Sequence, residues 1–460
     1  MAGFSQGGGV GLALSQWMVE GDPGFDVWAM DVARYGEWAT RNYTNEKVRE
    51  NYSRRFSIRF PNEELPAARP QQTTPLYDAM LAEGAVMGDS WGLETPLWFA
   101  PKGVQPRDVI SFHRSNDFPH VKAECVGVRE SVGVTEIANF AKYEFTGPGA
   151  ERYLALLMTN RLPRLGRMIL TPMLNAAGKL IGDFTIARAD ADRFLMWGSS
   201  QAQIHHMRWF EHHLPTDGSV QIRRFDQSLI GLALAGPRSR ELLARLTDED
   251  VTNEAFKFME HRAFDVANVP AMVNRVSYTG ELGYEIWVAP EYQRRLFQAI
   301  RTEGRDLGLI LFGMRALLSM RLEKNYPTWY RELRPIYGPF EAGLDRFVDL
   351  GKAEFFGHIP ARREHESGGK VRRLSFTVDA TDADVLGDEP IWHDGRVVGW
   401  VTSGGYGHRI GRSLAQGYVP IELAGDRRPG AFEIEILGER RGASVLSDPP
   451  YDPHGLLMRA

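Results

Sequence analysis

The sequence predicts a mixed α/β (α+β) protein that ends in a separate β-barrel domain. Between about residues 121 and 356, helical and strand patterns alternate, with amphipathic helices expected in PGAERYLALLMTNRL and PRSRELLARLTDED. From about Lys370 the pattern changes to short strand segments separated by Gly and Asp, such as KVRRLSFTV and EPIWHDGRVVGWVTSGGYG. Short strands with frequent turns are typical of a small barrel, and ESGGK at 366–370 is the expected linker.

The composition is that of an ordinary globular protein and excludes several function classes. With 460 residues, 43% hydrophobic and 25% charged, the chain is long enough for two or three domains. A formal net charge of -5 provides no basic surface for nucleic acid or an anionic membrane. The single cysteine, Cys125, excludes a disulfide framework or a cysteine-based metal site within one chain. Apolar runs are too short to span a bilayer and the N-terminus lacks a basic signal region, so we expect a cytoplasmic enzyme.

The first 120 residues divide into a helical part and a connector. GFSQGGGVGLALSQWMVEGDP predicts a Gly-rich turn followed by a short helix over residues 10–20, and helix is expected through much of residues 26–60. A Pro-rich stretch then begins a connector at 61–120, which includes an irregular aromatic segment at 91–103. The core is accordingly expected at 121–365 and the barrel domain at 370–455.

Two segments of the core share a pattern. GPGAERYL and GPRSRELL each place Gly-Pro directly before an amphipathic helix, where proline fits the first turn. We therefore predict a weak internal repeat of two similar αβ units.

Asp183 is the first candidate for chemistry. Residues 180–186 have the pattern of a buried strand, residues 189–192 form a turn, and RFLMWGSS returns as the second strand of a hairpin. Asp183 shares a strand face with Ile181 and Thr185, where an unpaired carboxylate costs several kcal/mol. It is therefore exposed, or paired with a cation such as Arg188, or retained for chemistry.

A second carboxylate and two arginines complete the candidates. Glu285 lies in YTGELGYEIWV on a strand otherwise suited to burial, and a carboxylate there can accept two side-by-side N–H bonds from an amino-pyrimidine or a guanidinium. A strand-edge ion pair is the simpler interpretation. Arg315 and Arg321 lie on a helix expected within 312–335, where each could hold a carboxylate ligand or be solvated or paired.

The histidine-rich segment QIHHMRWFEHHL is not expected to bind metal. His205 and His212 are seven residues apart, as are His206 and His213, which on a helix separates them by roughly 10 Å. One ion needs ligands one turn apart, so we predict no metal site and an ordinary polar helix face. Nucleophile-elbow, Walker A and H-E-x-x-H motifs do not occur in the sequence. The residues alone therefore suit a planar, amino-bearing, acidic ligand.

Six segments taken together resemble one family. GKLIGDFTIAR, LALAGPRSRELL, YTGELGYEI, FGMRALLSMRLEKNY, PFEAGLDRFV and GRSLAQGYVP follow the order seen in the tetrahydrofolate-dependent aminomethyltransferases, which include the T-protein of the glycine cleavage system. The chain resembles most the folate-binding C-terminal half of dimethylglycine and sarcosine dehydrogenases. This resemblance implies a three-domain cloverleaf around a central channel, with a C-terminal β-barrel domain and with residues 1–60 as a remnant of a flavin-domain tail.

The resemblance also implies roles for individual residues. Asp183 matches an aspartate beside the reactive nitrogens of the folate and is the expected catalytic residue. Glu285 matches the glutamate that binds the amino-pyrimidine of the pterin, and Tyr278 matches a tyrosine of the same pocket. Arg315 matches an arginine near the benzoyl-glutamate end. Because no strand followed by G-x-G-x-x-G occurs in these residues, we expect tetrahydrofolate but no FAD in this chain.

The implied function is one-carbon transfer from a methylated amine to tetrahydrofolate. The donor would resemble dimethylglycine or sarcosine, arriving as an iminium or aminomethyl group from a separate flavoprotein oxidoreductase, and the product would be 5,10-methylenetetrahydrofolate. One alternative is a direct N-, S- or O-demethylase that forms 5-methyltetrahydrofolate. Another is a non-catalytic folate-binding protein or subunit, although the cysteine motif of such relatives is missing from LEKNYPTWYREL.

Overall fold

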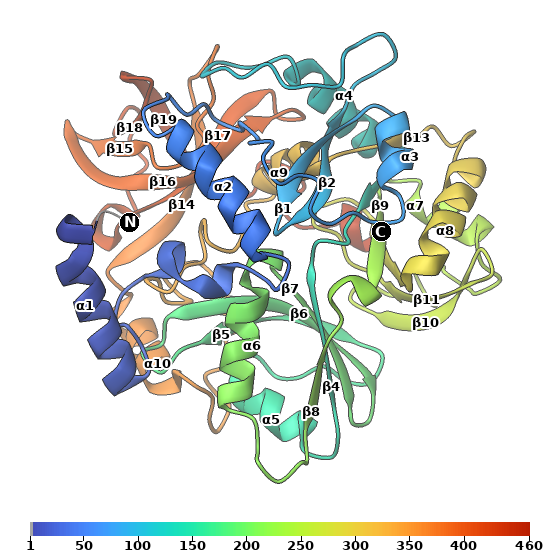
Figure 1. Cartoon of the computed structure of the whole chain (residues 1–460), viewed down its shortest axis with the longest axis horizontal. Helices are drawn as coiled ribbons and strands as arrows, with labels where there is room; N and C mark the ends of the chain where they lie inside the picture. The colour runs from blue at the N-terminus through green and yellow to red at the C-terminus, as the bar shows by residue number, and fades with distance from the viewer. Residues whose placement is uncertain (1–2) are drawn as a thin grey trace.

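The computed structural model describes residues 3–460, which form three lobes (Figure 1). Two lobes are built on open β-sheets and the third is a closed β-barrel. Helix α9 (Met314–Glu323) packs against helix α4 (Phe118–Glu130) and against strands of the barrel, and so joins the lobes. This mixed α/β architecture with a C-terminal barrel confirms the predicted fold class.

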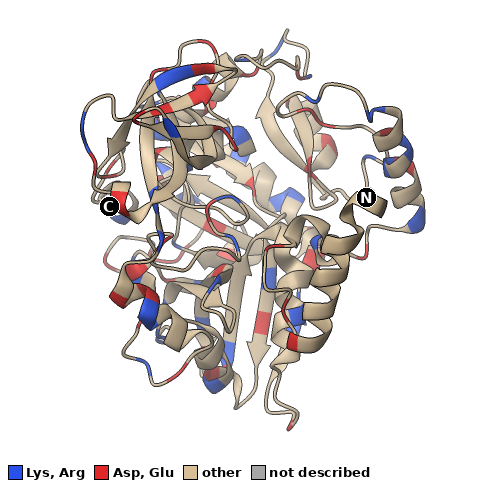
Figure 2. Ribbon diagram, turned by 90° about the vertical axis from the view of Figure 1, so that its left-hand side faces the viewer, with Lys and Arg blue, Asp and Glu red and all other residues tan. Residues whose placement is uncertain are grey.

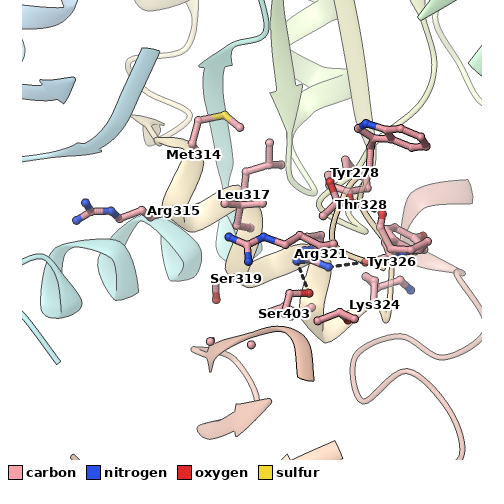
Figure 3. Close-up of a pocket in the computed structure, with 18 of the residues that line it drawn as sticks. Tyr278, Met314, Arg315, Leu317, Ser319, Arg321, Lys324, Tyr326, Thr328 and Ser403 are labelled. Carbon is pink, nitrogen blue, oxygen red and sulfur yellow. Dashed lines mark hydrogen bonds between the residues drawn. The ribbon is translucent and has the colours of Figure 1, made fainter. Parts of the chain in front are cut away.

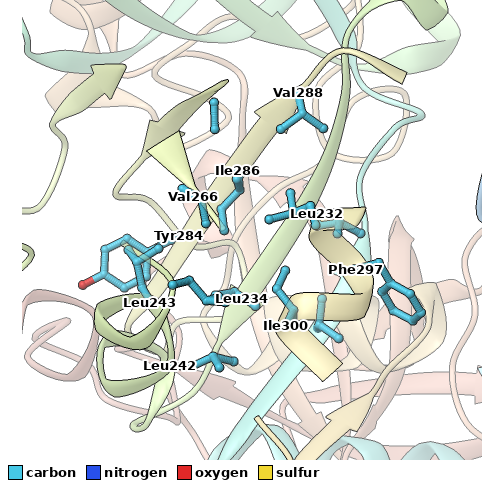
Figure 4. Close-up of a cluster of buried hydrophobic side chains, with 14 of the residues drawn as sticks. Leu232, Leu234, Leu242, Leu243, Val266, Tyr284, Ile286, Val288, Phe297 and Ile300 are labelled. Carbon is cyan, nitrogen blue, oxygen red and sulfur yellow. The ribbon is translucent and has the colours of Figure 1, made fainter. Parts of the chain in front are cut away.

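The first open sheet has six strands in the order β10-β11-β12-β9-β3-β13, antiparallel except for the β13–β3 pair. Its strands are β3 (Val132–Glu136), β9 (Ile230–Ala235), β10 (His261–Val266), β11 (Val269–Asn274), β12 (Gly283–Val288) and β13 (Leu309–Leu311). Helices α7 (Ser239–Arg245) and α8 (Pro290–Glu303) cover one face. Figure 4 shows Leu234 and Ile286 of the sheet against Leu243 and Ile300 of these helices, all fully buried. The apolar helix stripe predicted from PRSRELLARL thus forms this core.

The second open sheet has five strands in the order β5-β6-β7-β4-β8, all antiparallel. Its strands are β4 (Ala141–Thr146), β5 (Met168–Leu174), β6 (Leu180–Asp190), β7 (Arg193–Gly198) and β8 (Gln221–Arg224). The β6–β7 pair is the hairpin predicted around Asp183. Phe184 and Ile186 of β6 pack into a core with α5 (Ala150–Leu157) and α6 (Gln203–His212). Since side chains alternate along a strand, Asp183 faces the other side of the sheet.

The predicted internal repeat is present, and it interlocks the two sheets. Strand β4 leads through Gly-Pro into α5, and β9 leads through Gly-Pro into α7. Gly147 and Gly236 both have positive φ angles, +111° and +125°, and an added Cβ on either would lie within 2.5 Å of a backbone carbonyl oxygen. Strand β3 precedes β4 in the chain but pairs with β9, whereas β8 precedes β9 but pairs with β4. The strand that precedes each αβ unit in the chain therefore belongs to the sheet that contains the other unit.

The barrel closes through six strands in the order β14-β17-β16-β15-β18-β19, with β14 also paired to β19. Its strands are β14 (Val371–Val378), β15 (Pro390–His393), β16 (Arg396–Gly407), β17 (Arg412–Pro420), β18 (Phe432–Ile436) and β19 (Glu439–Leu446). Helix α10 (His358–Ser367) ends at Gly368 and Gly369, whose φ angles of 81° and 77° turn the chain into β14. The linker predicted at 366–370 lies at this turn.

The N-terminal segment differs from its sequence prediction. Helix α1 (Gly3–Glu20) runs through Gly7, Gly8 and Gly9, so the expected Gly-rich turn is wrong. Glycine lowers helix stability by up to about 1 kcal/mol per residue but does not forbid helical backbone angles. Beyond α1, the segment expected to be helical holds two short 3-10 turns, at Trp28–Met30 and Val32–Arg34, and helix α2 (Arg41–Ser53).

The expected connector at 61–120 contains regular structure. It holds α3 (Tyr77–Ala82) and a hairpin of β1 (Ala85–Ser90) and β2 (Leu93–Phe99), so the irregular structure expected at 91–103 is wrong for most of that segment. Pro96 hid the strand in the sequence, and it is accommodated because Met87 opposite it lies at a shift in pairing register. Leu76, Met80 and Leu93 join the core of the six-stranded sheet.

Charged residues of both signs are mixed along the chain, as Figure 2 shows for one side of the molecule. This distribution agrees with the small net charge of -5. Within residues 3–460, no helix has the length and apolar character needed to cross a membrane.

Candidate active site

A cavity of about 1960 Å³ lies where the lobes meet. Both open sheets contribute to its wall, together with α9, the loop at 324–334 and strand β16 of the barrel. Tyr278, Ser403 and the neighbouring residues Arg321 and Tyr326, which come from three parts of the chain, converge here in Figure 3. All four site residues predicted from the sequence, Asp183, Tyr278, Glu285 and Arg315, line this one cavity.

Asp183 presents an uncompensated carboxylate to the cavity. No Lys, Arg or His among residues 3–460 forms an ion pair with it, and Arg188, the candidate partner, pairs instead with Glu151 at 2.8 Å. Burial raises the pKa of Asp183 to about 6, and its own backbone N–H acts in the opposite direction. The carboxylate is therefore mostly ionised at neutral pH and can take up a proton at little cost.

Glu285 is held by neutral donors on one of its two oxygens. Its Oε2 accepts hydrogen bonds from Asn274 Nδ2 at 3.4 Å and from Trp287 Nε1 at 3.3 Å. Asn274 Oδ1 lies in turn 2.8 Å from Nδ1 of the buried His261, which orients the amide. Burial raises the pKa of Glu285 to about 7, although both hydrogen bonds lower it. The other oxygen, Oε1, makes no hydrogen bond within residues 3–460 and remains available to a ligand.

Aromatic side chains supply flat walls for the cavity. The rings of Tyr278 and Tyr326 stack with centroids 5.8 Å apart, and the Tyr278 hydroxyl donates to the Pro327 carbonyl at 2.7 Å. Burial raises the pKa of Tyr278 to about 12, and the charge of Asp183 adds to the increase. Trp197 packs against Trp287 with centroids 5.9 Å apart and thereby joins the two sheets at the cavity. The lining suits a planar ring system.

Arg315 is engaged by two carboxylates of the segment before α4. Its Nη1 donates to Asp108 Oδ1 at 2.8 Å and to Asp117 Oδ2 at 2.7 Å, and its Nη2 donates to Asp108 Oδ2 at 2.8 Å. Trp98 Nε1 also donates to Asp108 at 2.8 Å. In Figure 3, Arg315 points away from Tyr278 and Tyr326. A ligand carboxylate would therefore compete at Arg315 with two existing partners, and the expected contact to folate stays a prediction.

Arg321, the other helix arginine, forms a buried network with the barrel. Its Nη1 donates to Glu332 Oε2 at 3.1 Å, and its Nη2 donates to Ser403 Oγ at 2.9 Å. Thr402 Oγ1 donates to Glu332 Oε1 at 2.7 Å. Burial acts to raise the pKa of Glu332, but Arg321 and the two hydroxyls bring it below its ordinary value. This network fixes the barrel against α9 at the cavity wall.

The histidine segment is partly buried, and the predicted polar helix face is wrong there. His206 of α6 is fully buried, with its Nδ1 3.2 Å from the Tyr143 hydroxyl, and burial lowers its pKa well below the ordinary value. A neutral imidazole packs like a small aromatic ring, which the sequence pattern alone did not reveal. Among residues 3–460, no group of His, Cys, Asp and Glu side chains is arranged to hold a metal ion.

Sequence reasoning missed Asn274, His261 and Glu332. Asn274 ends a strand, His261 begins one, and Glu332 lies in an irregular loop, so hydrophobic periodicity gave no signal for them. The one available clue was Asn274, a polar residue at the end of a strand that pairs opposite the predicted carboxylate Glu285.

Family models match most of the chain. The GCVT N-terminal domain matches residues 76–352, the glycine cleavage T-protein C-terminal barrel domain matches 372–452, and the FAD dependent oxidoreductase central domain matches 20–74. The match at 372–452 covers the barrel described above, and the match at 76–352 includes α3 and the β1–β2 hairpin.

Individual proteins are similar over long stretches. Human mitochondrial dimethylglycine dehydrogenase is 35% identical over 449 residues, which cover 97% of this chain and 52% of that protein. The 4-methylaminobutanoate oxidase (formaldehyde-forming) of Paenarthrobacter nicotinovorans is 31% identical over 466 residues, covering 100% of this chain and 56% of that protein. The chain thus spans about half the length of these relatives.

A solved structure shares the fold. The glycine cleavage system aminomethyltransferase T from Bartonella henselae superposes with a TM-score of 0.71 at 22% identity, covering 83% of this chain and 98% of that chain. The match to both T-protein domain models shows that the chain belongs to the glycine cleavage T-protein family of aminomethyltransferases, and it is similar in sequence to dimethylglycine dehydrogenase.

Proposed function

We propose that the cavity binds tetrahydrofolate and transfers to it a one-carbon unit from an N-methyl amine that resembles dimethylglycine or sarcosine, forming 5,10-methylenetetrahydrofolate. The observation that carries this proposal is a pair of carboxylates, Asp183 and Glu285, that open into one cavity without a cationic partner within residues 3–460. Such groups cost stability and are typical of functional sites.

The cavity residues fit the chemistry of the folate. Glu285 Oε2 is occupied by Asn274 and Trp287, which leaves Oε1 as an acceptor for the amino-pyrimidine of the pterin. Tyr278 provides an adjacent aromatic wall. Tetrahydrofolate bound there supplies the nucleophilic nitrogen that receives the one-carbon unit.

Asp183 would stabilise positive charge and accept a proton at the amine nitrogens. Its pKa of about 6 keeps it ionised at neutral pH, so it stabilises a cationic amine electrostatically and can accept a proton from it. Tyr278 and Trp197 line the same cavity, and a ligand bound against them would displace water from Asp183 and strengthen the electrostatic effect. Much of the acceleration would come from holding the two reactants in contact.

A flavoprotein would supply the oxidised donor, either as another part of a longer protein or as a separate subunit. The match of residues 20–74 to an FAD dependent oxidoreductase central domain supports a flavin-linked reaction. The apolar side chains Phe4, Met18 and Val19 on α1 are exposed and available for such a contact. We expect residues 1–460 alone to purify without flavin, and a flavin absorption band would contradict that expectation.

Calorimetric titration with tetrahydrofolate under anaerobic, reducing conditions tests the proposal. We expect micromolar binding by the wild type and a loss of at least about 10-fold in Glu285→Ala. Absence of binding by the wild type would contradict the proposal. Product analysis with a donor then separates 5,10-methylenetetrahydrofolate from the 5-methyl product of a direct demethylase.

A further inference from the structure

We propose that Arg373 forms a carboxylate-binding subsite in the wall of the cavity. Arg373 lies on β14 of the barrel, next to the Arg321–Glu332 network, and lines the cavity. The subsite would bind an acidic group on a molecule that occupies the cavity.

The hydrogen bonds of Arg373 use only neutral acceptors and leave one nitrogen free. Nε donates to the Ala342 carbonyl at 2.8 Å, and Nη1 donates to the Asn325 carbonyl at 3.0 Å and to Gln416 Oε1 at 2.8 Å. These three bonds fix the plane of the guanidinium. Within residues 3–460, Nη2 makes no hydrogen bond and no carboxylate lies within 4.0 Å of the side chain.

This arrangement sets Arg373 apart from the other basic residues of the cavity. Five of these form ion pairs with carboxylates: Arg114 with Asp384, Arg315 with Asp108 and Asp117, Arg321 with Glu332, Lys324 with Asp452, and Arg334 with Asp26. The other cavity arginines without a carboxylate partner in the described chain are exposed to solvent: Arg59, Arg331, Arg346 and Arg459. Arg373 is half-buried, and burial lowers its pKa below the ordinary value. The charge of Glu332 acts in the opposite direction, but no carboxylate of residues 3–460 pairs directly with Arg373, so a ligand carboxylate would supply the missing partner.

Open space lies beside the free nitrogen. Gly343, which also lines the cavity, faces Arg373 so that an added Cβ would lie 3.5 Å from Nη2 and meet no other atom within 4 Å apart from those of residues 342–344. A carboxylate oxygen can therefore approach Nη2 without displacing protein atoms. A planar guanidinium held in place by three hydrogen bonds is suited to such an ion.

The inference rests on the proposed function, which provides two sources of a carboxylate. One is the glutamate of tetrahydrofolate, and the other is the carboxylate of an amino-acid-like N-methyl amine. The same ion pair with Arg373 would serve either molecule, so the experiment has one arm for each source.

Calorimetry on the full chain compares the wild type with Arg373→Gln and with Arg331→Gln, an exposed cavity arginine as matched control. In the folate arm, we expect Arg373→Gln to weaken tetrahydrofolate binding by about 10- to 100-fold while 6-methyltetrahydropterin, which lacks the glutamate, binds equally to both proteins. In the donor arm, the titrations are made at saturating tetrahydrofolate. There we expect Arg373→Gln to weaken the binding of dimethylglycine but not that of dimethylamine, which lacks the carboxylate. A carboxylate-dependent loss in either arm identifies the source.

Equal affinity of wild type and Arg373→Gln in both arms, with normal tetrahydrofolate binding, would overturn the subsite and leave the proposed function intact. The same conclusion follows if Arg331→Gln shows the loss and Arg373→Gln does not. Failure of the wild type to bind tetrahydrofolate would instead contradict the proposed function. If Arg373→Gln does not fold by circular dichroism, the wild type is titrated with dimethylglycine and its neutral amide, and with tetrahydrofolate and the tetrahydropterin. Absence of any preference for the carboxylate ligands would then overturn the inference.

Discussion

Arg188 donates a hydrogen bond to Glu151 at 2.8 Å and leaves Asp183, on the same strand, without a cationic partner in the described part of the chain. The two residues are separated by an odd number of positions, and successive side chains of a strand point to opposite faces. Arg188 therefore reaches α5, whereas Asp183 reaches the cavity. Of the alternatives that the sequence left open, pairing of Asp183 with Arg188 is wrong.

Replacing Asp183 by Asn should abolish most turnover without unfolding the protein. The carboxylate has no ion pair to lose, but it is the group that we expect to hold or accept the proton at the amine nitrogen, a contribution of about 100-fold or more. Turnover at pH 7.5 and circular dichroism are the measurements. Asp190→Asn, at the exposed end of the same strand, is the control and should keep full activity. Unchanged turnover in Asp183→Asn would remove Asp183 from the mechanism.

Replacing Glu285 by Gln should stabilise the protein at alkaline pH while weakening tetrahydrofolate binding. The pKa of Glu285 is raised from 4.5 to about 7, so its stabilising contribution is present below pH 4.5 and is lost as pH rises through 7. Gln keeps an oxygen for Asn274 and does not ionise. The free energy of unfolding of Glu285→Gln should therefore increasingly exceed that of the wild type between pH 5.5 and pH 8, by up to about 3 kcal/mol. Thermal unfolding at the two pH values measures it, with the exposed Glu249→Gln as control. Destabilisation at pH 8 would mean that Glu285 has a structural role.

Breaking the Arg321–Glu332 pair should destabilise the fold strongly. Both side chains are buried, so Arg321→Met leaves the Glu332 carboxylate uncompensated at a cost of about 3–5 kcal/mol. The pKa of Glu332 is lowered, so the contribution of the pair is present at neutral pH and is lost as pH falls below the ordinary value of 4.5. Denaturant unfolding at pH 7 measures the effect. The double variant Arg321→Met/Glu332→Leu should recover much of the loss, and a double variant as unstable as the single one would contradict this explanation.

Replacing Arg315 by Ala should loosen the segment at 104–117 that it anchors. The variant leaves Asp108 and Asp117 facing each other without a cation, so we expect faster proteolysis of this segment. The double variant Asp108→Asn/Asp117→Asn frees Arg315 and separates its two candidate roles. If Arg315 also binds the folate, that double variant should keep or improve tetrahydrofolate affinity, whereas Arg315→Ala should lose it. Equal affinity in all three proteins would assign Arg315 to structure alone.

The sequence by itself determined the kinds of elements, their order and the two strand carboxylates, because these depend on local periodicity and turn chemistry. The barrel, the hairpin around Asp183 and the repeated Gly-Pro units were all predictable in this way. Pro96 and the glycines of α1 misled the prediction, since backbone propensities are weak and neighbouring strands or favourable helical geometry override them.

Only the tertiary structure decided which charges meet. Asp183 on β6 and Glu285 on β12 belong to different sheets, yet both line one cavity, and no local sequence pattern encodes that meeting. Arg315 pairs with Asp108 and Asp117 of a distant segment, and Arg321 pairs with Glu332, 11 residues further along the chain. Arg373 has no carboxylate partner within residues 3–460. Ion pairing depends on distances of a few ångströms between segments remote in the chain, and packing of the whole fold sets those distances.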